Sequence, residues 1–358
     1  MNYLIVIPAL NPSKELTEYV DTLLSHGYSH ILVVDDGSRE DCRFIFDEIE
    51  AKNGCTILRH EVNMGKGKAL KDAMSYYLEH YMGPDSMTGV TLQGMITVDS
   101  DGQHIVPDVN KVAESMKEHP ESLVLGARDF DSDNVPSKSR FGNKCTIIAL
   151  KLFIGRSIHD TQTGLRGIPN NLIERFSTLH GDRFEYETVM LIDAIHSNTD
   201  IVEVPIETVY INNNSETHFN PIKDSVRIYK VILGTFFRYT LSSLSSFLVD
   251  YGVFCTLIYF LGKTSETESR SIWISTVIAR ICSSIFNYTI NKKVVFRSNR
   301  GPSTLVMYFG LCIVQMATSA ALVSLLNTTG FIPQIGKIIV DTLLFVISFR
   351  VQKLLIFK

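Results

Sequence analysis

With 358 residues the chain is long enough for two domains, and its net charge of −4 excludes the strongly basic surface typical of nucleic-acid-binding proteins. We therefore expect no nucleic-acid partner. The six cysteines are scattered and show no CxxC or other metal-ligand spacing, which is typical of free thiols in a reducing or membrane-embedded setting.

The first 205 residues alternate short apolar runs with longer segments of mixed polarity. Strands are predicted at about 3–7, 31–34, 56–60, 95–98 and 123–125. Helices are predicted at about 13–26, with Ser13 as the N-cap, at 39–52 and at 66–81. This alternation is the pattern of an α/β domain with a mostly parallel sheet and helices on both faces.

Three of the predicted strands end in polar loops, which are PALNP at 8–12, DDGS at 35–38 and DSDGQ at 99–103. Ligands of such sheets bind beyond the carboxyl ends of the strands, so these loops should line one crevice. In the third loop, Asp99 and Asp101 can converge on Mg²⁺ or Mn²⁺ if the chain bends at Gly102. An acidic surface turn is the alternative for this pair, and a simple turn with an N-cap is the alternative for DDGS.

The GKGK segment at 65–68 superficially suggests a phosphate-binding loop. It lacks the GxxxxGK[ST] spacing, so it is not a P-loop. Lys66, at the start of a predicted helix, is still placed to contact a diphosphate or a ribose, with a solvated lysine as the alternative.

The sequence changes character near residue 235, where four apolar stretches begin. They cover about 239–261, 272–290, 304–326 and 334–356, and each is close to the ~20 residues that span a bilayer. Positive charge is concentrated at 291–303 and at the C-terminal end, so the positive-inside rule places both, together with the N-terminal domain, in the cytoplasm. We expect an integral, multi-pass protein of the cell membrane with an all-α transmembrane four-helix domain. A buried helical domain of a soluble protein is the alternative.

Two basic amphipathic segments, 143–155 and 222–237, are predicted to lie in the lipid headgroup plane, with ordinary core packing as the alternative. Within the predicted spans, Arg280 is expected to pair with Asp250, with Asp341 or with both. The reason is that an isolated charge in a span costs about 2.5–3.5 kcal/mol on insertion scales.

Several motifs together carry a family resemblance. In this order, IPALNP, VVDDGS, NMGKGKAL, VDSDGQH and GARDF resemble family 2 glycosyltransferases with the GT-A fold. DTQTGLR at 160–166, VEVPIETVYI at 202–211 and HFNPIKDSVRIYKVI at 218–232 resemble the branch that transfers sugar to polyprenyl phosphate, which includes dolichyl-phosphate mannose synthases and bactoprenol glucosyltransferases. The segments 278–296 and 348–357 resemble the GtrA-type membrane domain. One departure is Pro12, which stands where the family's first motif usually has Glu.

The resemblance implies a GT-A domain at 1–217, an interfacial linker at 218–237 and a transmembrane domain at 238–358. It also implies roles for the residues that match the family's motifs. Arg128 and Arg140 would bind the lipid phosphate, with surface salt bridges as the alternative, and Glu187 would orient the sugar or a neighbouring arginine. Mg²⁺ or Mn²⁺ and the diphosphate would be held by Asp99, Asp101 and Gln103, which with the two arginines are the candidate catalytic residues. The nucleotide sugar would be bound by Pro8, Ala9, Asn11, Asp35, Asp36, Lys66, Asp99 and Ser100.

The implied activity is an inverting transfer from a nucleotide sugar, a UDP-sugar such as UDP-glucose, to polyprenyl phosphate at the cytoplasmic leaflet. In bacteria the lipid would be undecaprenyl phosphate. A phosphate monoester, with a second pKa near ~6, is largely dianionic at neutral pH and needs positioning rather than a general base. The alternatives are a GDP-mannose:dolichyl- or polyprenyl-phosphate mannosyltransferase, and a lipid-linked sugar translocator with a degenerate transferase domain. The sequence is compatible with a homo-oligomer.

Overall fold

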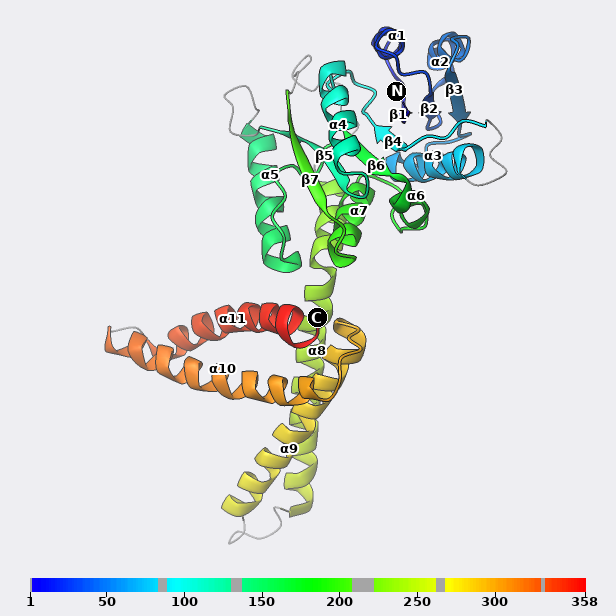
Figure 1. Ribbon diagram of the computed structural model, residues 1–358. Coiled ribbons are helices and arrows are strands. Elements are labelled where there is room, and N and C mark those ends of the chain that lie inside the picture. Colours follow the sequence, from blue (N-terminus) through cyan, green and yellow to red (C-terminus); the bar gives the residue numbers. More distant parts are fainter. Residues whose placement is uncertain (1, 83–88, 130–136, 208–221, 262–267, 330–331) are drawn as a thin grey trace. The chain divides into compact units, whose positions relative to one another are not determined.

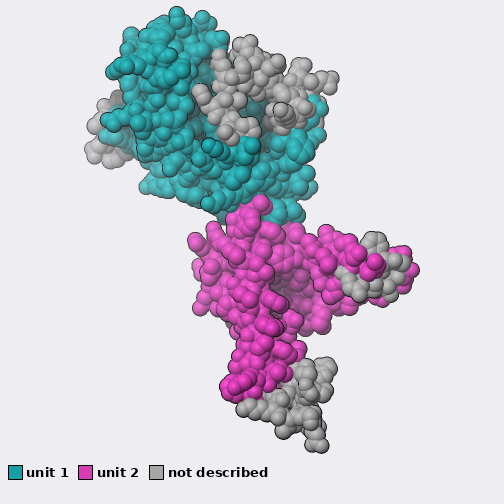
Figure 2. Space-filling model, turned by 180° about the vertical axis from the view of Figure 1, so that it is seen from behind, with its two compact units in different colours: residues 1–232 teal, residues 233–358 magenta. Residues whose placement is uncertain are grey.

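The computed structural model describes residues 2–82, 89–129, 137–207, 222–261, 268–329 and 332–358. Three parts of the family-like motifs lie outside these residues, namely Phe130, 208–211 and 218–221. The chain divides into two compact units, 1–232 and 233–358 (Figure 2). The division falls within the segment 218–237 that the sequence predicts as a linker.

Within the described residues of the first unit, seven strands form one sheet in the order β3-β2-β1-β4-β6-β5-β7. Neighbours are parallel in β3-β2-β1-β4 and in β5-β7, whereas β6 runs antiparallel to both β4 and β5. The expected mostly parallel sheet is therefore confirmed, with one reversed strand that the sequence analysis does not predict. The strands are β1 (Leu4–Ala9), β2 (Ile31–Asp35), β3 (Cys55–Arg59), β4 (Gly94–Thr97), β5 (Leu123–Arg128), β6 (Arg166–Pro169) and β7 (Ile201–Ile206).

Helices cover both faces of this sheet (Figure 1). One face is packed by α1 (Glu15–Ser25), α2 (Arg43–Glu50) and α4 (Val106–Glu118), and the other by α3 (Lys66–Tyr81), α6 (Asn170–Ser177) and α7 (Glu185–His196). In α1, Leu16, Val20 and Leu23 repeat at helical spacing and are fully buried, which fixes the face that meets the sheet. All six residues of β1 are buried, as expected of a strand covered on both faces.

The structure corrects one local detail of the sequence analysis. Lys14, not Ser13, occupies the N-cap position of α1, and it makes no side-chain capping bond. Ser13 contributes its carbonyl instead, which accepts the N–H of Leu16 at 3.2 Å.

The second unit is helical. Its helices follow the predicted apolar stretches, with α8 (Lys223–Leu261) starting in the first unit and α9 (Glu268–Ile290), α10 (Ser303–Thr328) and α11 (Pro333–Val351) lying in the second. Within the part of the chain that the structure describes, two segments, Lys223–Phe260 and Ser303–Leu326, are long and apolar enough to cross a membrane by length and composition. The four spans and their orientation stay predictions.

Two ion pairs are found among the described residues of this unit. Arg280 Nε lies 3.7 Å from Asp250 Oδ1, so this part of the expected pairing is confirmed. Asp341 does not join the pair, because it bonds the hydroxyl of Ser319 and the ammonium of Lys337, the latter at 2.8 Å. Helical spacing explains the difference, since Lys337 lies one turn before Asp341 on α11.

Candidate active site

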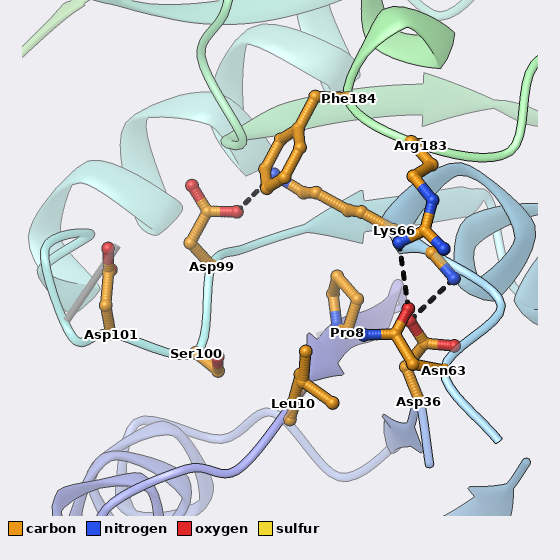
Figure 3. Close-up of a pocket in the computed structure, with 12 residues that line it drawn as sticks. Pro8, Leu10, Asp36, Asn63, Lys66, Asp99, Ser100, Asp101, Arg183 and Phe184 are labelled. Atoms are coloured by element: carbon orange, nitrogen blue, oxygen red, sulfur yellow. Dashed lines mark hydrogen bonds and ion pairs between the residues drawn. The ribbon is translucent and has the colours of Figure 1, made fainter. Parts of the chain in front are cut away.

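A cavity of about 290 Å³ opens at the carboxyl ends of β1, β2 and β4, beside the start of α3 (Figure 3). All three polar loops singled out in the sequence contribute to it, which is the arrangement expected of parallel strands that end at one edge. The lining residues are Pro8, Ala9, Leu10, Asp36, Asn63, Gly65, Lys66, Asp99, Ser100, Asp101, Arg183 and Phe184.

Lys66 is the central cation of this cavity. Its ammonium lies 2.6 Å from Asp99 Oδ1 and 2.8 Å from Glu187 Oε1, and 5.9 Å from the centre of the Phe184 ring. Burial would lower the pKa of Lys66, but the negative charges of Asp99 and Glu187 more than offset burial and raise it. Lys66 is therefore a permanent cation that links the acidic loop to α7.

Asp99 is held from three sides. Besides Lys66, the His104 ring nitrogen Nε2 lies 3.3 Å from Asp99 Oδ2. Burial would raise the pKa of Asp99, yet Lys66 and His104 keep it well below its usual range, so the group is a carboxylate. On the third side is Gly164, where a Cβ would overlap the carboxylate, and the Gly164 carbonyl accepts the Thr97 hydroxyl at 2.7 Å. The DTQTG segment is thus shaped around Asp99.

Asp101 differs from Asp99 because no cationic side chain bonds it among the described residues. Its Oδ1 accepts the backbone N–H of Gln103 at 3.1 Å. Burial and the negative charge of Asp99 raise the pKa of Asp101. Both carboxylates line the same cavity, and a hard cation between them would relieve their repulsion.

The donor set therefore fits Mg²⁺ or Mn²⁺, although it is a small one. Among the described residues, no group of three or more His, Cys, Asp and Glu side chains could hold a metal ion. Gln103 is not part of the cavity lining. Asp101 and Asp99 would be the carboxylate ligands, and diphosphate oxygens of a bound substrate would supply most of the others, as is usual for Mg²⁺.

The residues expected around the nucleotide separate into two groups. Pro8, Ala9, Asp36, Lys66, Asp99 and Ser100 line the cavity, whereas Asn11 and Asp35 do not. Asp35 Oδ1 accepts the N–H of Ser38 at 2.8 Å, and Asn11 Oδ1 accepts that of Arg39 at 2.8 Å. These two side chains shape the neighbouring loops.

Asp36 also has a structural task. Its Oδ1 accepts the N–H of Met64 at 2.9 Å and its Oδ2 accepts that of Gly65 at 2.8 Å, while the ring nitrogen Nδ1 of His60 lies 2.9 Å from Oδ1. Asp36 therefore holds the segment that leads into α3 and Lys66.

The two arginines expected to bind the lipid phosphate lie outside the cavity lining. Arg128, at the end of β5, donates from Nε and Nη2 to the fully buried Asp160 carboxylate at 2.6 and 3.1 Å. Such a two-point pair fixes the plane of the guanidinium. Arg140 is half-buried on α5 (Ser137–Ala149).

Five lining residues escaped the sequence analysis as individual sites: Leu10, Asn63, Gly65, Arg183 and Phe184. Leu10 and Asn63 lie inside motifs that the analysis quotes. Arg183 and Phe184 precede α7 and carry no spacing signal. Arg183 Nη1 donates to Asn63 Oδ1 at 3.0 Å, which joins two loops distant in the sequence.

The family model described as Glycosyl transferase family 2 matches residues 4–176, and the one described as GtrA/DPMS, transmembrane domain, matches residues 238–357. The first match contains the acidic loop and most of the cavity, and the second contains almost all of the second unit.

Three curated relatives match between 58% and 66% of the chain. An uncharacterized protein of Methanocaldococcus jannaschii is 30% identical over 237 residues, which is 65% of this chain and 92% of the relative. The UDP-N-acetylglucosamine–dolichyl-phosphate N-acetylglucosaminyltransferase of Methanococcus voltae is 29% identical over 58% of this chain and 85% of the relative. The dolichyl-phosphate beta-glucosyltransferase of Dictyostelium discoideum is 25% identical over 66% of this chain and 74% of the relative. The chain is a glycosyltransferase of family 2 with a GT-A-like domain, and it carries a GtrA/DPMS transmembrane domain.

Proposed function

We propose that this glycosyltransferase transfers a sugar from a UDP-sugar, such as UDP-glucose, to a polyprenyl phosphate at the cytoplasmic leaflet of the membrane. The observation that carries the proposal is the cavity in which Pro8 and Asp36 share one space with Lys66, Asp99 and Asp101. An apolar wall beside a group of acids and a lysine suits a nucleoside diphosphate and its counter-cation. The names of the relatives that act on dolichyl phosphate support the acceptor class.

The residues of the cavity divide the work of binding the donor. Pro8, Ala9 and Asp36 border the nucleotide, while Asp99, fixed by Lys66 and His104, faces the sugar diphosphate. Bound at Asp99 and Asp101, Mg²⁺ or Mn²⁺ would stabilise the negative charge that develops on the departing nucleoside diphosphate. Gln103 shapes this loop through its backbone bond to Asp101.

The acceptor needs no general base. A phosphate monoester is largely a dianion at neutral pH, so its oxygen can attack C1 of the sugar directly. The new C1–O bond forms as the bond from C1 to the diphosphate oxygen breaks, which inverts C1 and releases UDP. Arg128 and Arg140 orient the acceptor phosphate. A guanidinium carries five N–H donors, so one edge can hold Asp160 while another meets a phosphate.

The surface of α5 supports contact with lipid headgroups. Phe141 and Ile148 are 73% and 63% exposed, and Lys144 on the same helix and Lys151, two residues after its end, are exposed as well. Leu150, by contrast, is fully buried, so part of the amphipathic segment 143–155 packs into the protein. Exposed apolar side chains flanked by lysines match an interfacial helix.

Sugar transfer by the full chain tests the proposal. The purified protein in detergent is given labelled UDP-glucose, UDP-N-acetylglucosamine or GDP-mannose, with undecaprenyl phosphate and with or without Mn²⁺. Metal-dependent formation of a lipid-linked sugar from a UDP-sugar is expected. Transfer from GDP-mannose alone would overturn the donor class, and failure of all three donors with intact protein would favour a translocator with an inactive transferase domain.

A further inference from the structure

The cations of the cavity are not equivalent. Of the lining side chains, Asp36, Asp99 and Asp101 are acids, and Lys66 and Arg183 are bases. Lys66 is already engaged by two carboxylates at 2.6 and 2.8 Å. A diphosphate that enters this cavity therefore meets an excess of negative charge unless a second cation faces it.

Arg183 is the lining cation that pairs with no carboxylate among the described residues. Among the described residues, the one side chain that its guanidinium bonds is the neutral amide of Asn63, which accepts from Nη1 at 3.0 Å, while the backbone N–H of Arg183 donates to Glu185 Oε1 at 3.3 Å. A guanidinium has five N–H donors in a rigid plane, so one bond to Asn63 orients the group and leaves other donors for a ligand. Figure 3 shows Arg183 and Asn63 across the cavity from Asp101 and Ser100.

The backbone holds Arg183 in this place. The carbonyl of Asp182 accepts the N–H of Lys68 at 3.0 Å, and the Asp182 carboxylate accepts from Lys71 Nζ at 2.7 Å. Gly65 and Gly67 allow this close approach, because a Cβ at either one would overlap the 182–186 segment. The loop is therefore fixed against the first turn of α3, whose positive dipole end also favours an anion.

We propose that Arg183, oriented by Asn63, binds the diphosphate of the donor from the side opposite the acidic loop. The inference rests on the proposed function, since it takes a nucleotide sugar as the donor. The diphosphate would then lie between a cation site at Asp99 and Asp101 and a guanidinium. The location favours the donor over the acceptor phosphate, because Arg183 lines the same cavity as Pro8, Ala9 and Asp36.

Calorimetric titration of the full chain in detergent with UDP, UMP and uridine tests this. Arg183→Gln should lower the affinity for UDP by about 10- to 100-fold, the range expected for lost hydrogen bonds to a charged group, and leave the affinity for uridine unchanged. Arg183→Lys should bind UDP more tightly than Arg183→Gln does. Asn63→Ala, which keeps the positive charge of Arg183, should lower the affinity for UDP less than Arg183→Gln does. Arg43→Gln, at an exposed position on α2, is the control for loss of a positive charge.

The outcomes separate two failures. If the unaltered protein does not bind UDP, the proposed function with a UDP-sugar donor is wrong. If it binds UDP and Arg183→Gln binds UDP equally well, the inference about Arg183 is wrong. The inference is also wrong if Arg183→Gln lowers the affinity for uridine as much as the affinity for UDP. A raised KM for polyprenyl phosphate with unchanged UDP affinity would instead place Arg183 on the acceptor.

Discussion

Two aspartates two residues apart are given different roles by their neighbours. Asp99 is neutralised by Lys66 at 2.6 Å and touched by His104, so its position and charge are fixed before any substrate arrives. Asp101 bonds a backbone N–H instead, and burial together with the charge of Asp99 raises its pKa. Asp101 is therefore the carboxylate with most to gain from a bound cation.

Asp101→Asn should lower kcat/KM for sugar transfer by about 100-fold or more, because the cation that would stabilise the departing diphosphate would lose one of its two carboxylate ligands. Steady-state kinetics across a Mn²⁺ titration would measure this, and the variant should need more metal. Asp21→Ala, which removes an exposed carboxylate paired with Lys52, is the matched control. Unchanged activity in Asp101→Asn would contradict the metal site.

Gly164 is the residue whose missing side chain matters most to Asp99. Gly164→Ala would push a methyl group into the carboxylate, so transfer should fall by about 100-fold, as expected when reacting groups are misplaced by about an ångström. Gly142→Ala on α5, where a Cβ meets nothing within 4 Å, should keep its activity. Equal kinetics in the two variants, with equal thermal stability, would show that Asp99 is not positioned by this contact.

At the scale of elements, the sheet edge explains why separate loops share one function. β1, β2 and β4 are parallel, so the loops that follow them must meet. The reversed strand β6 adds a further segment, because its first residue, Arg166, pairs with Thr97 at the end of β4. The DTQTG segment before β6 is thereby delivered to the same edge as Asp99.

Helix α5 carries a prediction at this scale. The double variant Phe141→Ser/Ile148→Ser removes two exposed apolar side chains, which should raise the KM for polyprenyl phosphate about tenfold and leave the KM for the nucleotide sugar unchanged. Kinetics in lipid vesicles would measure both constants. Phe44→Ser, at an exposed position on α2, is the control. An equal rise in the KM for polyprenyl phosphate in this variant would contradict the interfacial role of α5.

On the scale of the whole molecule, hydrogen bonds between polar side chains connect the helices of the second unit to one another. Fully buried Asn291 donates to Asn287 Oδ1 at 2.7 Å and to Gln352 Oε1 at 3.0 Å, and Gln352 donates to Tyr239 at 3.3 Å. Asn287 also accepts the hydroxyl of Tyr308 at 3.0 Å. These bonds connect α8, α9, α10 and the short π-helix Gln352–Ile356 that follows α11.

Asn291→Ala should lower the unfolding free energy of the membrane unit by about 1–2 kcal/mol, since it leaves the Gln352 amide with fewer partners. Thermal unfolding in detergent would detect the shift. Thr256→Ala is the control, because this exposed hydroxyl bonds only the carbonyl of Gly252 in its own helix among the contacts described. Equal melting of the two variants would show that the buried amides add little.

Local patterns were enough to predict the strands β1 to β5, the polar loops that follow β1, β2 and β4, and the apolar C-terminal helices, but neither β6 nor β7. They could not predict the contacts that complete the site, because these join distant parts of the chain. Lys66 to Glu187 and Asn63 to Arg183 are examples. β6 was missed because it is a four-residue strand whose central glycine resembles a loop.

A practical consequence follows from the parallel strands. The cavity lies at the carboxyl ends of the parallel strands, so the amino ends of β1, β2 and β3 lie at the opposite edge of the sheet. The short turn at 51–54, which leads into β3, is therefore far from the proposed active site. A fluorophore attached at exposed Asn53 → Cys would sit on the far rim of the sheet, where it can report rotation or diffusion of the enzyme without competing for either substrate.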